Sequence, residues 1–192
     1  GVLYTYFKQG EDGQIKPLST RWEVSQHSLT EEISRHGLYY GAGCITMKGP
    51  LFGANAGTGD YDFSYKPIDM VDALGKQHDK EEDVRGFVSW RHPQNIFADI
   101  QFVKGLEKYL DLAKDKNFID PFTGKKPSEE AISAASNALT LFRGEIAEKK
   151  VSMLDLLRQG KVNQRLFAWW EKKVAEAEKK EANLPKLEKT DK

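Results

Sequence analysis

The chain has 192 residues, 39% hydrophobic and 30% charged, which is the composition of a polar globular protein large enough to bury its own core. Its 29 Lys and Arg residues balance 29 Asp and Glu residues, and this argues against a nucleic-acid-binding protein, which usually carries a basic excess. The single cysteine, Cys44, excludes an intramolecular disulfide, and no apolar stretch is long enough to span a membrane.

Residues 1–36 are expected to form an N-terminal extension. Glu11-Asp12-Gly13 is typical of a hairpin turn, and Leu29-Thr30-Glu31-Glu32 is expected to open a short helix. Residues 37–66 are then rich in glycine, which indicates irregular backbone of the kind that often approaches a ligand closely.

Helical patterns dominate the rest of the chain. Pro67 suits the first position of a helix that ends near Asp83, and Val84–Pro93 is interpreted as a linker or short hairpin. Asn95 suits the cap of a second helix that reaches about Leu112.

After a turn at residues 120–124, three further helices are predicted near 128–143, 151–158 and 162–182. Residues 184–192 are interpreted as a charged tail. The predicted fold class is therefore mostly α.

The second helix contains an anomaly. Its apolar residues recur at helical spacing and form one stripe, made of Ile96, Val103, Leu106 and Leu110. Asp99 falls inside this stripe, three residues after Ile96 and four before Val103. A carboxylate on a core-facing stripe is costly unless a charge or hydrogen-bond donors compensate it.

The first helix contains a similar anomaly. His78 lies seven residues after Val71 and four after Leu74, so it points to the interior as well. A His78–Asp99 hydrogen bond between antiparallel helices would satisfy both groups at once. Taken alone, His78 fits a satisfied core histidine and Asp99 a buried cap or ion-pair residue.

Taken together, the two groups favour a functional site, because perturbed ionisable groups collect at such sites. Asp79 is one step round the helix from His78 and can face a neighbouring loop. Hydrolysis by an activated water needs a base, a group that orients the base, and an electrophile. His78, Asp99 and a cation bound by Asp79 would supply all three.

These residues lie in segments that resemble a known family. Asp72-Ala73-Leu74-Gly75-Lys76-Gln77-His78-Asp79 resembles the active-site helix of calcium-dependent secretory phospholipases A2. Upstream, Tyr39-Tyr40-Gly41-Ala42-Gly43 resembles the family's calcium loop. Downstream, residues 98–102 resemble the segment with the second catalytic Asp, particularly in the disulfide-free phospholipase domain of parvovirus capsid proteins. The three pieces occur in the family's order and cover about residues 39–110.

The resemblance implies a fold with two antiparallel catalytic helices and a glycine-rich calcium loop, plus additional C-terminal helices. The phospholipase A2-like core would span residues 37–115, and residues 116–183 would be a helical C-terminal part of the same domain. The implied activity is hydrolysis of the sn-2 acyl ester of glycerophospholipids with bound Ca²⁺.

The resemblance also implies roles for individual residues. His78 would be the general base, Asp99 would hold its tautomer, and Asp79 would bind calcium. Asp72 would be a supporting residue. The calcium shell would be completed by the backbone carbonyls of Tyr39, Gly41 and Gly43. The Gly41 N–H would help to stabilise the oxyanion.

The sequence departs from the family in several places. Glu82 replaces a tyrosine that helps to hold the catalytic Asp, and Tyr65 is one candidate to replace that support. The segment from Cys44 to Lys66 is long for the family and would form a lid, a substrate loop or a partner site. The family's cysteine framework is absent, so packing alone must hold the core.

A disulfide-free phospholipase domain without a signal peptide looks like the C-terminal toxin domains of bacterial polymorphic toxins, such as those behind YD-repeat (Rhs) shells. Gly1-Val2-Leu3-Tyr4 lacks signal-peptide features, so we expect an effector that other proteins deliver to a target-cell membrane. The implied partners are a phospholipid membrane, an immunity protein and a toxin carrier or shell, with no nucleic acid.

Two alternatives remain open. One is a catalytically silent module that binds a lipid or protein partner, and Glu82 is the feature that favours it. The other is a metal-dependent nuclease, which the absent basic excess disfavours. The aromatic segment Leu166-Phe167-Ala168-Trp169-Trp170 with Arg165, Lys172 and Lys173 fits either a packed C-terminal helix or an interfacial membrane anchor.

Overall fold

The computed structural model describes residues 7–9, 15–17, 21–24, 32–37, 39–40, 63, 66–84 and 93–188. This part of the chain is mostly helical, as the sequence predicts. Its helices are α1 (Met70–Val84), α2 (Ile96–Ala113), α3 (Glu129–Arg158) and α4 (Gln164–Lys179), with a 3₁₀ turn at Pro93–Asn95 before α2. None of these described helices is long and apolar enough to cross a membrane.

Short strands near the N-terminus form two antiparallel pairs. β1 (Phe7–Gln9) pairs with β2 (Ile15–Pro17), as the predicted hairpin requires, and its predicted turn at residues 11–13 lies outside the described residues. β3 (Arg21–Val24) pairs with β4 (Glu32–Arg35). The helix expected to open at residues 29–32 is therefore wrong at Glu32, because pairing with β3 supplies backbone partners that an isolated helical turn lacks.

The start of α1 corrects a second prediction. The helix begins at Met70 and not at Pro67, because Asp69 caps it. Asp69 Oδ1 accepts the Asp72 N–H at 2.9 Å, and the Asp69 carbonyl accepts the Ala73 N–H at 3.0 Å. An aspartate in this position satisfies N–H groups that have no partner inside the helix.

α3 corrects a third prediction, because it joins two predicted helices, 128–143 and 151–158, into one. Its cap is Ser128, whose hydroxyl accepts the Ala131 N–H at 3.0 Å. Gly144 is the weakest helix former between the two predicted segments, and the Ala, Glu, Ile and Lys residues around it sustain the helix.

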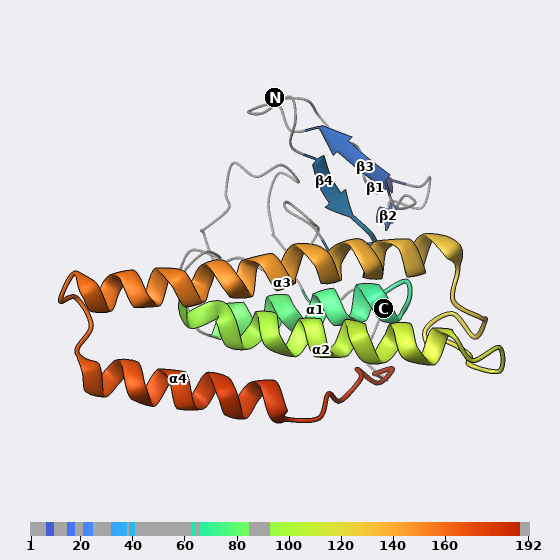
Figure 1. Ribbon diagram of the computed structural model, residues 1–192. Helices are drawn as coiled ribbons and strands as arrows, with labels where there is room; N and C mark the ends of the chain where they lie inside the picture. The colour runs from blue at the N-terminus through green and yellow to red at the C-terminus, as the bar shows by residue number, and fades with distance from the viewer. Residues whose placement is uncertain are drawn as a thin grey trace.

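α1 and α2 run antiparallel and pack closely. Leu74 of α1 lies against Gly105 of α2, and His78, one turn later in α1, meets Asp99, earlier in α2. α3 is antiparallel to α2 in the same sense, since Arg143 pairs with Glu107 while Lys149 pairs with Asp99. In Figure 1, α3 and α4 flank the pair formed by α1 and α2.

Two apolar clusters hold the helices together. The larger joins α1, α2 and α3, where small alanines let α3 approach; it includes Val71, Leu74, Phe102, Leu106, Tyr109, Ala134, Ala135 and Ala138. The smaller joins α2, α3 and α4 and consists of Ile96, Ile100, Met153, Trp170 and Val174. Beyond α4, Leu184 packs against the larger cluster, although residues 184–192 read as a charged tail in sequence.

Two helical glycines provide a matched test of this packing. A Cβ at Gly105 would lie 2.5 Å from Leu74 Cδ2, whereas a Cβ at Gly144 would meet no atom within 4 Å. We expect Gly144→Ala to stabilise the protein by about 0.5–1 kcal/mol through helix propensity. Gly105→Ala should instead destabilise it by about 1–3 kcal/mol through overpacking. Urea unfolding measures both, and equal stabilisation by the two changes would contradict the packing of α1 on α2.

Candidate active site

A buried histidine–aspartate pair links α1 to α2. His78 Nε2 lies 2.8 Å from Asp99 Oδ1, and the relative exposures of the two side chains are 8% and 0%. This is the contact that the two apolar stripes predict. Since an ionised carboxylate only accepts hydrogen bonds, the pairing assigns the proton to Nε2 and leaves the lone pair on Nδ1.

Aromatic rings fix the plane of the His78 imidazole. The ring centroids of Phe102 in α2 and Phe142 in α3 lie 5.1 and 5.0 Å from it. Phe142 meets His78 edge-on, and the two phenylalanines also pack edge-to-face, at 4.9 Å. The imidazole is therefore held on three sides by packing and a hydrogen bond. The gap beside it between α1 and α2 is too small to hold a water molecule, and its other lining residues are Leu74, Gln77, Ala98, Gln101 and Phe102.

The second oxygen of Asp99 faces a residue that the sequence reasoning missed. Lys149 Nζ, from α3, lies 2.5 Å from Asp99 Oδ2, and the lysine side chain is only 2% exposed. The same ammonium lies 3.6 Å from Glu145, one turn earlier in α3. Burial raises the pKa of the Glu145 carboxyl, and the Lys149 charge acts in the opposite direction.

Asp79, the predicted calcium ligand, lies at the outer edge of the pair. Its Oδ1 is 3.7 Å from His78 Nδ1, and its side chain is 23% exposed. In the part of the chain that the structure describes, no group of three or more His, Cys, Asp or Glu side chains is placed to hold a metal ion. The predicted calcium site does not require three such side chains, because most of its ligands are backbone carbonyl oxygens.

Part of the predicted site lies outside the described residues. This holds for Gly41 and Gly43 of the calcium loop, for Tyr65, and for the segment 44–66 apart from Phe63 and Lys66. Glu82 is part of α1. Phe63, one of the described residues of that segment, stacks on the Tyr39 ring, with centroids 6.5 Å apart.

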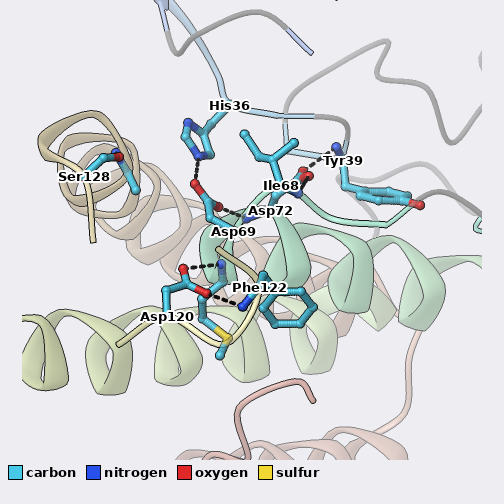
Figure 2. Close-up of polar contacts among 10 residues, drawn as sticks. His36, Tyr39, Ile68, Asp69, Asp72, Asp120, Phe122 and Ser128 are labelled. Carbon is cyan, nitrogen blue, oxygen red and sulfur yellow. Dashed lines mark hydrogen bonds and ion pairs between the residues drawn. The ribbon is translucent and has the colours of Figure 1, made fainter. Parts of the chain in front are cut away.

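The start of the loop is tied to α1 through Asp72. This carboxylate is fully buried, and its two oxygens accept the N–H groups of Tyr39 at 2.7 Å and Ile68 at 2.9 Å (Figure 2). Asp72, which the resemblance marks as a supporting residue, therefore fixes the position of Tyr39.

Gly75 brings the same segment close to the Asp79 side of α1. A Cβ at Gly75 would lie 3.1 Å from the backbone nitrogen of Tyr40, which is closer than most Cβ contacts, so the absence of a side chain at Gly75 eases this approach. Gly75 and Asp79 are four residues apart and share one helix face. The chain thus leaves Tyr40 one helical turn from the Asp79 carboxylate, where a loop that shares a cation with Asp79 must start.

A second buried histidine–aspartate pair lies at the beginning of α1. His36 Nε2 is 2.5 Å from Asp69 Oδ2 (Figure 2). The His36 N–H donates to the Tyr40 carbonyl. Burial lowers the pKa of His36, but the hydrogen bond to Asp69 and the charges of Asp69, Asp72 and Glu130 together raise it more, so the pKa lies above its usual 6.5. His36 and Asp69 are 33 residues apart in the sequence, and no local pattern indicates that they pair.

A third aspartate joins this end of α1 to the turn at 120–125. Asp120 accepts the N–H groups of Met70 and Phe122, each at 2.8 Å. Burial raises the pKa of its carboxyl, and these two backbone donors act in the opposite direction. Asp69, Asp72 and Asp120 all lie where the unpaired N–H groups and positive dipole end of α1 favour negative charge.

The aromatic segment of α4 has features of both interpretations, the packed C-terminal helix and the interfacial membrane anchor. Phe167 and Trp170 pack into the smaller apolar cluster. Leu166 and Trp169 are 47% and 54% exposed, and they lie among the exposed side chains of Arg165, Lys172 and Lys173. One side of the helix therefore packs on the core while the other presents apolar and basic groups together.

No family model, curated protein or solved structure matches the chain. Its function is therefore argued from the chemistry and geometry of the site.

The His36–Asp69 pair predicts how stability depends on pH. Because the folded-state pKa of His36 is raised, its stabilising contribution is fully present below about pH 6.5, the unfolded value, and is lost as pH rises through the folded value. We expect wild type to be more stable than His36→Gln at pH 6, with a smaller difference at pH 9. Urea unfolding at both pH values measures this, and a constant difference would rule out a charged His36. Asp69→Asn, which keeps an oxygen for the helix cap, should remove the pH dependence.

Proposed function

We propose that the chain is a calcium-dependent phospholipase A2-like hydrolase that cleaves the sn-2 acyl ester of glycerophospholipids. The observation that carries the proposal is the buried His78–Asp99 hydrogen bond between antiparallel helices, 2.8 Å long, with Asp79 beside it. The motif order along residues 39–110 supports the same conclusion.

The geometry suits His78 as a general base. With Nε2–H donated to Asp99, Nδ1 takes a proton from water while the water oxygen attacks the ester carbonyl carbon. The tetrahedral intermediate then breaks its bond to the glycerol oxygen, which receives the proton from Nδ1. The products are a fatty acid and a lysophospholipid. The Asp99 carboxylate stabilises the imidazolium.

Calcium would be held by the Asp79 carboxylate and by backbone carbonyls of Tyr39, Gly41 and Gly43. The fit rests on the partly exposed Asp79 carboxylate and on the approach of Tyr40 to Gly75 on the same helix face. When bound, the ion supplies a Lewis acid that polarises the ester carbonyl. The Gly41 N–H would add a hydrogen bond to the developing oxyanion.

The outer side of α4 suits a protein that works on membranes. Exposed Leu166 and Trp169 can enter the headgroup region, and the neighbouring Arg165, Lys172 and Lys173 can meet lipid phosphates. A phospholipid membrane is the partner proposed on this basis. Delivery by a toxin carrier or shell, neutralisation by an immunity protein and action at a target-cell membrane belong to the same proposal.

A second candidate is a catalytically silent phospholipase-like module. The observation that favours it is the Lys149–Asp99 ion pair, because Asp99 then has both a cation and a hydrogen-bond donor without any need for turnover. A buried ion pair of this kind is also compatible with a purely structural role.

Fatty-acid release from phosphatidylcholine–phosphatidylglycerol vesicles separates the two candidates. We expect release with millimolar calcium, none with chelator, and a loss of at least about 100-fold in His78→Ala and Asp99→Asn, because the base and its orienting group are removed. Asp111→Asn is the control on α2, since Asp111 is exposed and pairs with Lys114. Calcium-independent release would sink the proposal, and a folded, calcium-binding protein without activity would establish the silent module.

Asp72 offers a separate test of the loop. Asp72→Asn removes one of the acceptors that hold Tyr39 and Ile68, so we expect half-maximal activity to need roughly 10-fold more calcium, equivalent to about 1.4 kcal/mol. Asp120→Asn is the matched control, because Asp120 also binds N–H groups at the start of α1 but does not contact Tyr39. An equal shift in both variants would mean that general destabilisation, and not the loop, changed the calcium requirement.

A further inference from the structure

Asp99 is fully buried, and each of its two carboxylate oxygens needs a polar partner in place of water. Oδ1 faces His78 Nε2 at 2.8 Å, and Oδ2 faces Lys149 Nζ at 2.5 Å. Removing a carboxylate from water is costly unless a cation and donors replace the water. Lys149, itself only 2% exposed, supplies that cation.

We propose that Lys149 is a positioning residue for the His78–Asp99 dyad. Its ammonium pairs with Oδ2 of the Asp99 carboxylate and holds it in place, so that Oδ1 is aimed at His78 and accepts its Nε2–H. This inference rests on the proposed function, in which Asp99 sets the tautomer that leaves Nδ1 ready to take a proton. Lys149 does not touch the reacting atoms and acts only through Asp99.

The position of Lys149 is itself fixed by its surroundings. Glu145 lies 3.6 Å from the ammonium and one turn away on the same helix. Further along, the Arg143–Glu107 pair at 3.0 Å fixes the register of α3 against α2. Phe142, on the same side of α3, packs edge-on to the His78 ring at 5.0 Å. One face of α3 therefore contacts both members of the dyad.

Lys149 also accounts for a departure from the family pattern. Glu82 stands where the family has a tyrosine that supports the catalytic aspartate. That support would come from the first catalytic helix, whereas Lys149 provides it from α3 and brings a full charge. A neutral tyrosine hydroxyl can donate a hydrogen bond to the carboxylate but brings no charge, so the two solutions differ in electrostatics as well as in origin.

The test uses the full chain and compares Lys149→Met with Lys150→Met. Lys150 is the next residue in α3, and it pairs with Glu178 at 2.5 Å on the partly exposed side of the helix. With vesicles and calcium, we expect kcat of Lys149→Met to fall 10- to 100-fold while KM is unchanged, because a buried residue behind Asp99 does not touch lipid. Lys150→Met should keep both constants.

A second readout does not depend on turnover. Long-range ¹H–¹⁵N spectra report the tautomer of His78, and wild type should show protonated Nε2. Lys149→Met should show a mixture of tautomers, and Lys150→Met the wild-type spectrum. If wild type hydrolyses no lipid, the proposed function fails while the spectra still decide the role of Lys149.

Lys149→Gln covers the case in which the methionine variant does not fold. It retains an N–H donor without charge, so we expect an intermediate kcat and a partly mixed tautomer. The proposal would be overturned if every folded Lys149 variant showed the wild-type kcat and the wild-type His78 spectrum. The Lys149–Asp99 ion pair would then have only a structural role.

Discussion

The arrangement of the helices depends on the burial of one carboxylate, that of Asp99 in α2. Such a group is tolerated only with a donor and a cation in contact, and these come from two other helices, His78 in α1 and Lys149 in α3. Each contact is short, so each fixes a helix along its axis as well as around it. A shift of α1 or α3 by one turn would leave a buried charge unpaired, which costs far more than the loss of a few apolar contacts.

The N-terminal end of α1 repeats this principle with more negative charge. Asp69, Asp72 and Asp120 all accept N–H groups there, and His36 provides the matching positive group. The helix end gains its caps, and the segment with His36 and Tyr39 is attached to α1 at the same time. The two ends of α1 thus differ: the N-terminal end positions the start of the glycine-rich loop, and the C-terminal half carries His78 and Asp79.

The residues of this site that could be predicted from the sequence are those that interrupt an apolar stripe on a helix. His78 and Asp99 each interrupt an apolar stripe, and the stripes also indicate which helix faces meet. Lys149 interrupts a similar stripe, between Phe142 and Met153, but the predicted break between residues 143 and 151 left it outside any helix. His36 and Asp69 are 33 residues apart and break no periodicity, so no local pattern could pair them. The α1 start was misplaced because proline and aspartate are both typical of helix N-termini, and only the hydrogen bonds distinguish them.

The three-helix origin of the dyad also bears on what distinguishes a working enzyme from a silent module. Asp99 is satisfied by His78 and Lys149 in either case, so the presence of the dyad does not by itself require turnover. What matters is the outer edge of His78, where Nδ1 lies 3.7 Å from a carboxylate that is partly exposed. Asp79 shares a helix face with Gly75, where the backbone of Tyr40 approaches α1 closely. A histidine kept only for packing does not require a second aspartate on its solvent side, whereas the proposed base, which works beside a bound cation, does.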